Sequence, residues 1–349
     1  MAGYKLTTEF YYKSREIIRE YSPAGSTTAK ETITDYDYGY ANGHYQLTSK
    51  TERNSNNSGL VTTYKYPEDL TLTGAQDTAR QALISKFMKS VILEQNVTKD
   101  VSLLSKTVNN YTVISGIPLL TSIDVKNEAN PTEQRIQIVS FDDAGNVLRQ
   151  KKKDDVDYTF IWGHNKTYPI AQVQNALETE VAFTSFETTD AGNWVFAPSH
   201  PSLVTGVSRT GDKYITIPAG TTISKSGLSS TGSYVVSYWS KNGSYSVNGT
   251  TGSAGSTING WTYYEHAISN PGGGTITLTG TGSIDELRLY PKNAQMVTYC
   301  YNPAVGILCS TDANGATTSY DYDLLGRLTV IRDTNQKILK TLVYHFKGE

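Results

Sequence analysis

The sequence has few of the residues that define several common protein classes. Its 349 residues include 2 cysteines and 3 methionines, and charged residues make up 18% of the chain, with a formal net charge of −2. One pair of cysteines cannot define a disulfide framework. A charge this low and this balanced gives no electrostatic footprint for nucleic acid or for an anionic membrane. We therefore expect no nucleic-acid partner.

Long apolar segments are absent as well. No stretch approaches the ~18 apolar residues that a membrane-spanning helix needs, so we expect no membrane insertion. Residues 1–21, MAGYKLTTEFYYKSREIIREY, contain no apolar core of the kind that signal peptides carry. If the protein acts outside the cell, the sequence therefore predicts that this chain is a piece of a longer one.

Signatures of catalysis and metal binding are also missing. The chain contains no nucleophile elbow, no HExxH motif and no Walker loop. Its five histidines lack the spacing of metal ligands: His44, His164, His200, His266 and His345. The sequence thus predicts a protein that is not an enzyme and that needs no cofactor for catalysis.

Tyrosine, in contrast, is abundant, with 25 residues. Tyr and Thr suit a pleated, half-buried surface. Up to about residue 70, Tyr or Leu alternates with Thr or Ser in short segments, and turn-like stretches such as NSNNSG separate these segments. This pattern predicts antiparallel strands joined by tight turns. Near residues 75–94 the period changes, and Leu83, Phe87 and Val91 recur at helical spacing. We expect one amphipathic helix there, covering a sheet, and strands again up to residue 177.

Residues 178–291 have a different composition. Gly, Ser and Thr dominate, and short strand-like segments recur at intervals of about 8–12 residues, which is typical of a β-sandwich. From residue 292 to 349 the first pattern resumes. The sequence therefore predicts a mostly β protein with three regions, 1–177, 178–291 and 292–349. Cys300 and Cys309 lie in the last region, where a hairpin could join them in a disulfide; two small buried thiols are the other interpretation.

Pairs of aromatic residues separated by one residue recur in the last region. They are Tyr299/Tyr301, Tyr320/Tyr322 and Tyr344/Phe346, and similar pairs stand earlier at Tyr36/Tyr38 and Tyr64/Tyr66. A regular spacing of about 20 residues or more signals a repeat architecture, in which each unit needs neighbours to bury its face.

The second of these pairs begins the stretch YDYDLLGRLTVIRD, residues 320–333. Asp321 and Asp323 would share one face of a strand, and paired carboxylates can perform acid–base chemistry, but nothing nearby indicates a pocket that would shift their pKa. A hairpin explains more of the residues. In that interpretation Tyr320 and Tyr322 pack, Asp323 and Gly326 make a turn, Arg327 begins the return strand, and Asp333 begins the next turn.

These residues resemble a known family. The stretch is similar to the rearrangement-hotspot (RHS), or tyrosine–aspartate (YD), repeat, whose pattern is Tyr-x-Tyr-Asp-x-x-Gly-Arg-Leu followed by Asp. The matching residues are Tyr320, Tyr322, Asp323, Gly326, Arg327, Leu328 and Asp333. Asn335 and Gln336 stand near the family's second glycine, and FDDAGNVLR, residues 141–149, is a weaker match. Residues 160–176 further resemble surface proteins of Bacteroidetes that carry such repeats. The resemblance implies a β-sheet shell or scaffold that wraps, displays or delivers something else, although the self-cleaving aspartate motif of toxin-delivering members is not visible here.

Residues 178–291 resemble carbohydrate-binding modules with a jelly-roll fold, through the segments FTSFE, SYVVSYWSK and SIDELRLYP. In that family the last strand closes the sandwich beside the first. The resemblance would bring Glu187 and Asp285 together, where their oxygens could hold a structural Ca²⁺. Two ligands are few for Ca²⁺, which favours the other interpretation, that both are ordinary surface carboxylates.

A carbohydrate site needs exposed aromatic rings beside hydrogen-bonding groups, because sugar rings have apolar faces rimmed by hydroxyls. The candidates are Trp194, Tyr238, Trp239, Trp261, Tyr263 and Tyr264. We expect Trp261 and Tyr263, which share a strand face, to contact a glycan before Trp239 does. The other interpretation is that most of these residues are core, since Trp is highly buried on average.

The leading functional hypothesis is a non-enzymatic RHS/YD-repeat scaffold, secreted or at the cell surface, that binds a glycan or cell-surface polysaccharide through its jelly roll. Other parts of a longer RHS polypeptide would be its protein partners. The alternative is a fragment of a toxin-delivery shell in which the sheet encloses cargo and the sandwich is a spacer.

Overall fold

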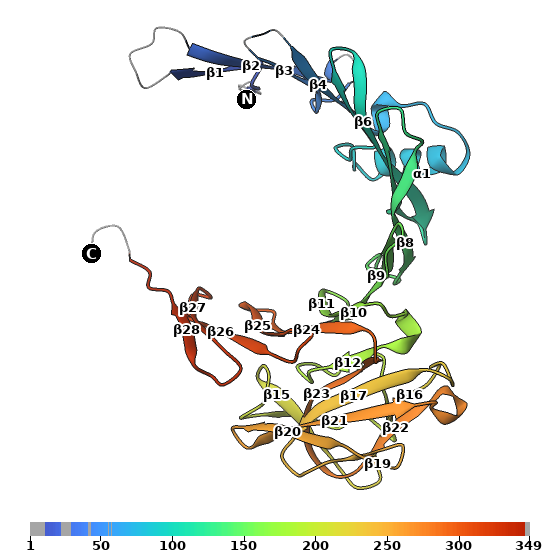
Figure 1. The fold of residues 1–349 in the computed structure, drawn as a ribbon, viewed down its shortest axis with the longest axis vertical. Coiled ribbons are helices and arrows are strands. Elements are labelled where there is room, and N and C mark those ends of the chain that lie inside the picture. The colour runs from blue at the N-terminus through green and yellow to red at the C-terminus, as the bar shows by residue number, and fades with distance from the viewer. Residues whose placement is uncertain (1–10, 22–28, 41–42, 55, 57, 346–349) are drawn as a thin grey trace, which may run out of the picture. The chain divides into compact units, whose positions relative to one another are not determined.

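The computed structural model describes residues 11–21, 29–40, 43–54, 56 and 58–345. In this part of the chain the regular secondary structure is almost entirely antiparallel β-strand, with one α-helix (Figure 1). It divides into two compact units, residues 1–138 and 139–349. The predicted fold class, mostly β and antiparallel with one helix, is confirmed.

The first unit is an antiparallel sheet in which each strand pairs with the next along the chain. All residues of β3 and β4 are half-buried, so this sheet has no thick core and its strands depend on their neighbours. The strands are β1 (Arg15–Tyr21), β2 (Ala29–Tyr38), β3 (Leu47–Arg53), β4 (Gly59–Lys65), β5 (Glu94–Lys99), β6 (Ser102–Ile114), β7 (Ile117–Asn127) and β8 (Glu133–Phe141), whose last three residues belong to the second unit.

A single helix, α1 (Gly74–Ser85), packs on β6 and β7 after a short 3-10 turn, η2 (Pro67–Asp69). Its buried residues are Ala79 and Leu83. The helix begins where the sequence predicts but ends well before residue 94, because Phe87 adopts a left-handed φ of 59°. The Met88 amide then donates to the Leu83 carbonyl (2.9 Å), which closes the helix end in a Schellman motif. No helix among the described residues is long and apolar enough to cross a membrane.

The second unit contains repeat strands that lie on both sides of the inserted region in sequence. Strand β11 pairs antiparallel with β24, so the chain leaves this sheet after β11 and returns directly beside it. We call these strands the repeat sheet: β9 (Val147–Lys152), β10 (Asp157–Gly163), β11 (Tyr168–Gln174), β24 (Gln295–Asn302), β25 (Gly306–Thr311), β26 (Thr317–Tyr322), β27 (Leu328–Arg332) and β28 (Ile338–Thr341).

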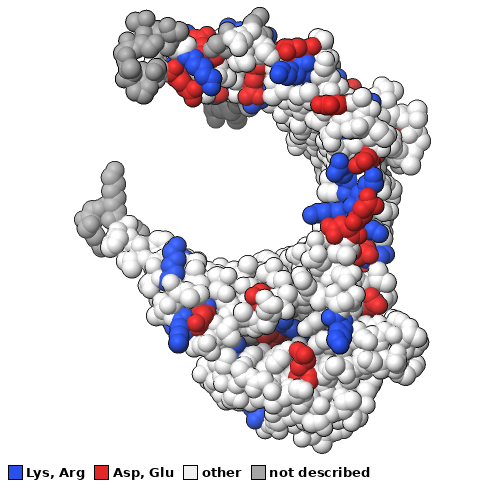
Figure 2. Space-filling model, viewed as in Figure 1, with Lys and Arg blue, Asp and Glu red and all other residues white. Residues whose placement is uncertain are grey.

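The insert between β11 and β24 is a β-sandwich, and on the face drawn in Figure 2 it carries few charged side chains. Its first strand pairs with its last, as the resemblance implied. The larger sheet contains β12 (Ala182–Thr184), β14 (Leu203–Thr205), β15 (Lys213–Ile217), β17 (Ser233–Ser240), β20 (Ser253–Ile258), β21 (Trp261–Ser269) and β23 (Gly282–Pro291). The smaller sheet contains β13 (Val195–Ala197), β16 (Thr222–Lys225), β18 (Ser246–Val247), β19 (Thr250–Thr251) and β22 (Ile276–Thr279), and two 3-10 turns complete the insert, η3 (Glu178–Glu180) and η4 (Gly272–Gly274).

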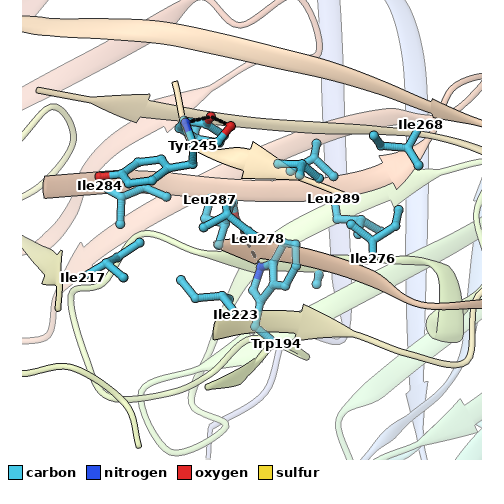
Figure 3. Close-up of a cluster of buried hydrophobic side chains, with 14 of the residues drawn as sticks. Trp194, Ile217, Ile223, Tyr245, Ile268, Ile276, Leu278, Ile284, Leu287 and Leu289 are labelled. Atoms are coloured by element: carbon cyan, nitrogen blue, oxygen red, sulfur yellow. Dashed lines mark hydrogen bonds between the residues drawn. The ribbon is translucent and has the colours of Figure 1, made fainter. Parts of the chain in front are cut away.

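The sandwich core is aliphatic with a few aromatic rings (Figure 3). The Trp194 indole lies within it and donates a hydrogen bond to the Leu287 carbonyl (3.4 Å). In β23, a bulge opposite Ser237–Trp239, with Glu286 at a φ of 51°, breaks the simple alternation. Ile284 and Leu287 therefore both reach this core, although three positions separate them.

A second hydrophobic core joins the sandwich to the repeat sheet. Ala182 of β12 lies in the sandwich core, while the next residue, Phe183, is 1% exposed and lies in the second core. The repeat sheet supplies Ile161, Ile170, Val173 and Met296, among others, to this core. Strand β12 thus divides its side chains between two cores, as period-2 alternation requires when both faces are covered. The predicted three-region division stays a prediction.

Candidate functional site

Trp261, the first predicted sugar-binding residue, lies in the interior. Its side chain is 0% exposed, and its Nε1 donates to the Val207 carbonyl (3.0 Å). The Tyr214 ring packs edge-on against the indole (5.2 Å between ring centroids), and the Lys241 ammonium lies 4.6 Å from the indole centroid. The expectation that Trp261 is an open platform is therefore wrong.

Trp239 is covered too. It is 5% exposed, and the guanidinium of Arg209 lies 4.3 Å from the centre of its ring. Tyr263 is half-buried, packs edge-on against Trp239 (5.5 Å) and donates its hydroxyl to Glu265 Oε2 (3.0 Å). No aromatic residue of 178–291, a range that is described throughout, is exposed. Alternation identified the two faces of β17 correctly but could not show that Arg209 and Tyr263 cover Trp239 on the outer face.

Glu187 and Asp285, the predicted calcium ligands, both hold the loop that precedes β15. Glu187 Oε1 accepts backbone N–H groups from Asp212 (3.0 Å) and Lys213 (3.1 Å). Asp285 Oδ2 accepts those of Arg209 (2.8 Å) and Thr210 (3.0 Å). In this part of the chain, as elsewhere among the described residues, no group of three or more His, Cys, Asp or Glu could hold a metal ion. A structural Ca²⁺ stays a prediction, and the hydrogen bonds give both carboxylates another role.

Both carboxyl groups are buried, and burial raises their pKa values. The pKa of Glu187 rises to about 7, although the backbone N–H groups of Lys213 and Asp212 oppose the shift. The pKa of Asp285 lies well above its ordinary value because Asp285 is completely buried. Neither residue is an ordinary surface carboxylate.

Replacing Glu187 with glutamine should change how stability depends on pH. The carboxyl has a pKa of about 7 in the folded protein, against an ordinary 4.5. The folded state therefore binds its proton more tightly, and stability falls as the pH rises through this range. We expect urea unfolding to show that the free energy of unfolding of Glu187→Gln, relative to that of wild type, rises by about 2 kcal/mol as the pH increases from about 5 to about 8. The difference between the two proteins isolates Glu187 from other titrating groups, and a constant difference would contradict its assigned pKa.

Glu286 and Arg288 form a buried ion pair between the sandwich and the repeat sheet. Both lie on β23, and they are 3% and 6% exposed. The Arg288 guanidinium bonds to Glu286 Oε1 and also donates to the Thr298 hydroxyl of β24 (2.6 Å). That hydroxyl donates in turn to Glu286 Oε1 (3.0 Å). Nearby, Arg209 reaches the Thr334 carbonyl, past β27, at 3.5 Å. A polar network therefore accompanies the second core.

The two cysteines lie directly opposite each other on β24 and β25. Their Cα atoms are 5.2 Å apart, and a disulfide joins Cys300 to Cys309. Of the two interpretations left open by the sequence, the structure shows the disulfide.

Four aspartates make the same turn between repeat strands. In each, Asp Oδ1 accepts the backbone N–H groups two and four residues ahead, at 2.8–2.9 Å. The residue between those two donors has a left-handed φ. That residue is glycine in the first three turns and Gln336 in the fourth, so the departure from the family pattern puts a glutamine where glycine is favoured. The aspartates are Asp142, Asp312, Asp323 and Asp333.

Replacing Asp323 should weaken its hairpin. Besides the two turn amides, Asp323 accepts a hydrogen bond from Arg327 Nε (2.8 Å). We expect Asp323→Ala to lower the midpoint of thermal unfolding by a few degrees, because two N–H groups lose their acceptor. Asp323→Asn keeps an oxygen for those amides and should recover most of the loss. Equal effects of the two substitutions would contradict this role.

The paired tyrosines link neighbouring strands through their hydroxyls. Tyr322 donates to the carbonyl of Ile307 on β25 (2.7 Å), and Tyr301 donates to that of Pro169 on β11 (3.1 Å). Similar bonds, at 2.8–3.1 Å, join Tyr38 to Lys13, Tyr66 to Leu47 and Tyr344 to Leu328. Phe346, the partner predicted for Tyr344, lies outside the described residues.

Residues 320–333 therefore form the hairpin that the sequence predicts, in preference to an acid–base site. Tyr320 approaches Ser310 through its hydroxyl (3.4 Å), and the Asp321 carboxylate accepts a hydrogen bond from Arg332 Nε (2.9 Å). Asp321 and Asp323 thus pair with different arginines of the hairpin, which gives each carboxylate a structural role.

The strongest link to known proteins covers this same segment. Residues 308–338 match the RHS Repeat family model. The matched residues include the turns of Asp312, Asp323 and Asp333, so the RHS repeat coincides with the structural repeat described above. No curated protein matches the sequence.

The solved structures that align with the chain are much longer, and the chain spans less than a quarter of their length. The crystal structure of TcdB2-TccC3-Cdc42 aligns over 95% of this chain and 14% of its own, at 12% identity and a TM-score of 0.24. TcdB2-TccC3 aligns over 94% of this chain and 22% of its own, at 9% identity and a TM-score of 0.23. TcdB2-TccC3 without its hypervariable C-terminal region aligns over 94% of this chain and 24% of its own, at 8% identity and a TM-score of 0.19. TM-scores this low do not establish a shared fold.

The sequence analysis did not identify Glu286 and Arg288, the buried ion pair between the sandwich and the repeat sheet. Glu286 and Arg288 alternate in DELRL, a segment of β23, and stand out as charges in a region otherwise poor in charge. Alternating opposite charges within an apolar strand are a signal that both are buried and paired, and this signal could have found them.

Proposed function

We propose that this chain is a segment of a non-enzymatic scaffold protein, secreted or at the cell surface, in which RHS-type repeats build a sheet and the sandwich is a fixed part of it. The observation that carries the proposal is the double role of β12 and β23. Both strands contribute side chains to the sandwich core and to the contact with the repeat sheet. A mobile spacer would not need buried side chains on its outer face.

The RHS match supports the repeat part of the proposal, and the turns and hydroxyl bonds support a structural role for its most conspicuous residues. Other parts of a longer RHS polypeptide are the protein partners that we propose. The alternative, a fragment of a toxin-delivery shell, shares the same sheet and differs in what the sheet encloses. A toxin segment that co-purifies with the sheet after the full-length polypeptide is expressed would favour this alternative.

We also propose that the scaffold binds carbohydrate. The resemblance of the insert to jelly-roll carbohydrate-binding modules, and of residues 160–176 to Bacteroidetes surface proteins, supports this role. Because Trp261 and Trp239 are buried, we propose a binding site away from those two rings.

A paired assay tests both parts of the proposal on the whole chain. We expect the purified protein to bind at least one polysaccharide in a plant, algal and host panel and to release no reducing ends from any of them. Hydrolysis above the rate of a buffer control would overturn the non-enzymatic assignment. Silence across the panel by correctly folded protein would overturn carbohydrate binding.

A further inference from the structure

A cleft of about 540 Å³ lies where loops of the sandwich meet turns of the repeat sheet. The repeat sheet contributes His164 from the β10–β11 turn, and Tyr301 and Asn302 from the end of β24. The sandwich contributes Glu187, Asp212 and Lys213. The volume lies in the range of about 300–1,000 Å³ typical of small-ligand sites, and junctions between structural layers are places where such sites commonly form.

One side of the cleft is aromatic and rigid. The Tyr301 ring stacks on Tyr168, with 4.8 Å between ring centroids and 17° between planes. The His164 ring stands edge-on to both tyrosines, at 5.7 and 6.1 Å. The hydrogen bond from the Tyr301 hydroxyl to the Pro169 carbonyl fixes this group of rings. Packed rings offer an apolar wall without the entropy cost of ordering it on binding.

The other side of the cleft carries a polar group that is already oriented. Glu187 is 7% exposed, and its Oε1 is occupied by two backbone N–H groups. Lys213 Nζ donates to the Glu187 carbonyl (3.0 Å), so the backbone of this residue is held as well. Oε2 accepts no hydrogen bond from the described residues, which leaves it for a hydroxyl of a ligand. A buried oxygen fixed in this way gives directional recognition.

The charges at the cleft favour a ligand without net charge. Asp212 and Lys213 are neighbours of opposite sign, and both line the cleft. A strongly cationic ligand would be repelled by Lys213, and a strongly anionic ligand would meet two carboxyl groups, those of Asp212 and Glu187. An apolar ring wall opposite fixed oxygens is the chemistry that a sugar ring requires.

We propose that this cleft binds a short neutral saccharide, with the half-buried His164 ring against a sugar face and Glu187 Oε2 accepting a hydrogen bond from a sugar hydroxyl. Tyr301, which is 9% exposed, supports the His164 ring from the core side. This inference rests on the carbohydrate binding proposed above. It assigns that binding to the cleft between the sandwich and the repeat sheet instead of to the sandwich alone. Both components are then needed for binding, which gives the fixed docking of the sandwich a functional consequence.

Two variants test the assignment in the full chain. Glu187→Gln keeps an acceptor for the two backbone amides but turns the second oxygen into a donor. His164→Asn removes a ring while tolerating the left-handed φ of 52° at this turn. The matched control is Glu180→Gln, because the Glu180 carboxylate is likewise held by two hydrogen bonds, from the Leu177 N–H and the Tyr234 hydroxyl, but lines a different cavity. Circular dichroism and thermal unfolding would check that each variant folds.

The readout is the dissociation constant from titration calorimetry, for saccharides identified on an array of neutral and charged glycans. Free mono- and disaccharides and polysaccharides that end in the same sugar would be titrated separately, to distinguish a free ligand from a chain end. We expect each cleft variant to bind about tenfold more weakly, as the loss of one ligand hydrogen bond or ring contact predicts, and the control to bind as wild type does.

Binding that survives both cleft substitutions would overturn the assignment to this cleft while leaving carbohydrate binding in place. A preference for charged glycans would overturn the neutral class. No binding to any saccharide would overturn the carbohydrate proposal and this inference with it.

Discussion

Replacing Arg288 with methionine should lower the free energy of unfolding by about 3 kcal/mol near neutral pH, because it leaves a buried carboxylate without its partner. Glu286 is 3% exposed, and burial alone would raise its pKa. The charge and hydrogen bond of Arg288, together with Arg209 and Thr311, outweigh burial, so that the pKa lies below its ordinary value. Without Arg288, we expect burial to raise the pKa of Glu286 above its ordinary value. Urea unfolding of wild type and variant measures the loss.

Two further measurements separate an unpaired charge from lost packing. The loss should shrink as the pH is lowered, because Glu286 can then take up a proton and become neutral. The double variant Glu286→Gln/Arg288→Met should recover much of the stability, since it buries no charge. A double variant as unstable as Arg288→Met, with no dependence on pH, would contradict the ion-pair explanation.

Truncating Phe183 to alanine should cost about 3–5 kcal/mol, the usual effect of removing a fully buried aromatic ring. Phe183 is 1% exposed and packs in the second core, away from the sandwich interior. The loss should therefore reflect weaker docking of β12 and β23 on the repeat sheet. Thermal and urea unfolding of the whole chain provide the measurement.

Two matched variants accompany Phe183→Ala. Phe183→Leu keeps most of the apolar volume and should cost about 1 kcal/mol. Val195→Ala, on the same sandwich but 57% exposed, should stay within about 0.5 kcal/mol of wild type. If Phe183→Ala were as mild as Val195→Ala, the second core would not hold the sandwich.

The features that could be predicted from the sequence are those that local chemistry decides. The turn at Asp323 needs an acceptor side chain and a left-handed residue three positions on, and both are visible in DLLGR. The alternation of Tyr234 and Val236 with Ser237 and Trp239 correctly separated the two faces of β17. The match of residues 308–338 covers the segment where these local rules recur most regularly.

The features that were missed depend on long-range packing. Period-2 alternation states that Trp239 and Val236 face opposite ways, but it cannot state that Arg209 and Tyr263 cover Trp239. The burial of Trp261 follows from contacts with Val207 and Tyr214 that sequence spacing does not reveal. Phe87 continued an apolar helical pattern, yet its left-handed conformation ends α1 and leaves its side chain 85% exposed. For the two tryptophans the covering partner decided the outcome, and for Phe87 the backbone conformation did.

Hydrogen exchange read by mass spectrometry tests most directly whether the sandwich and the repeat sheet form one scaffold. Amides of β17 in the sandwich and of β24 in the repeat sheet would be followed in wild type and in Phe183→Ala. We predict that both strands open with the same free energy in wild type, and that the substitution accelerates exchange in both by the same factor. Acceleration confined to one strand would contradict the account, because it would show that the sandwich folds independently of the sheet that it covers.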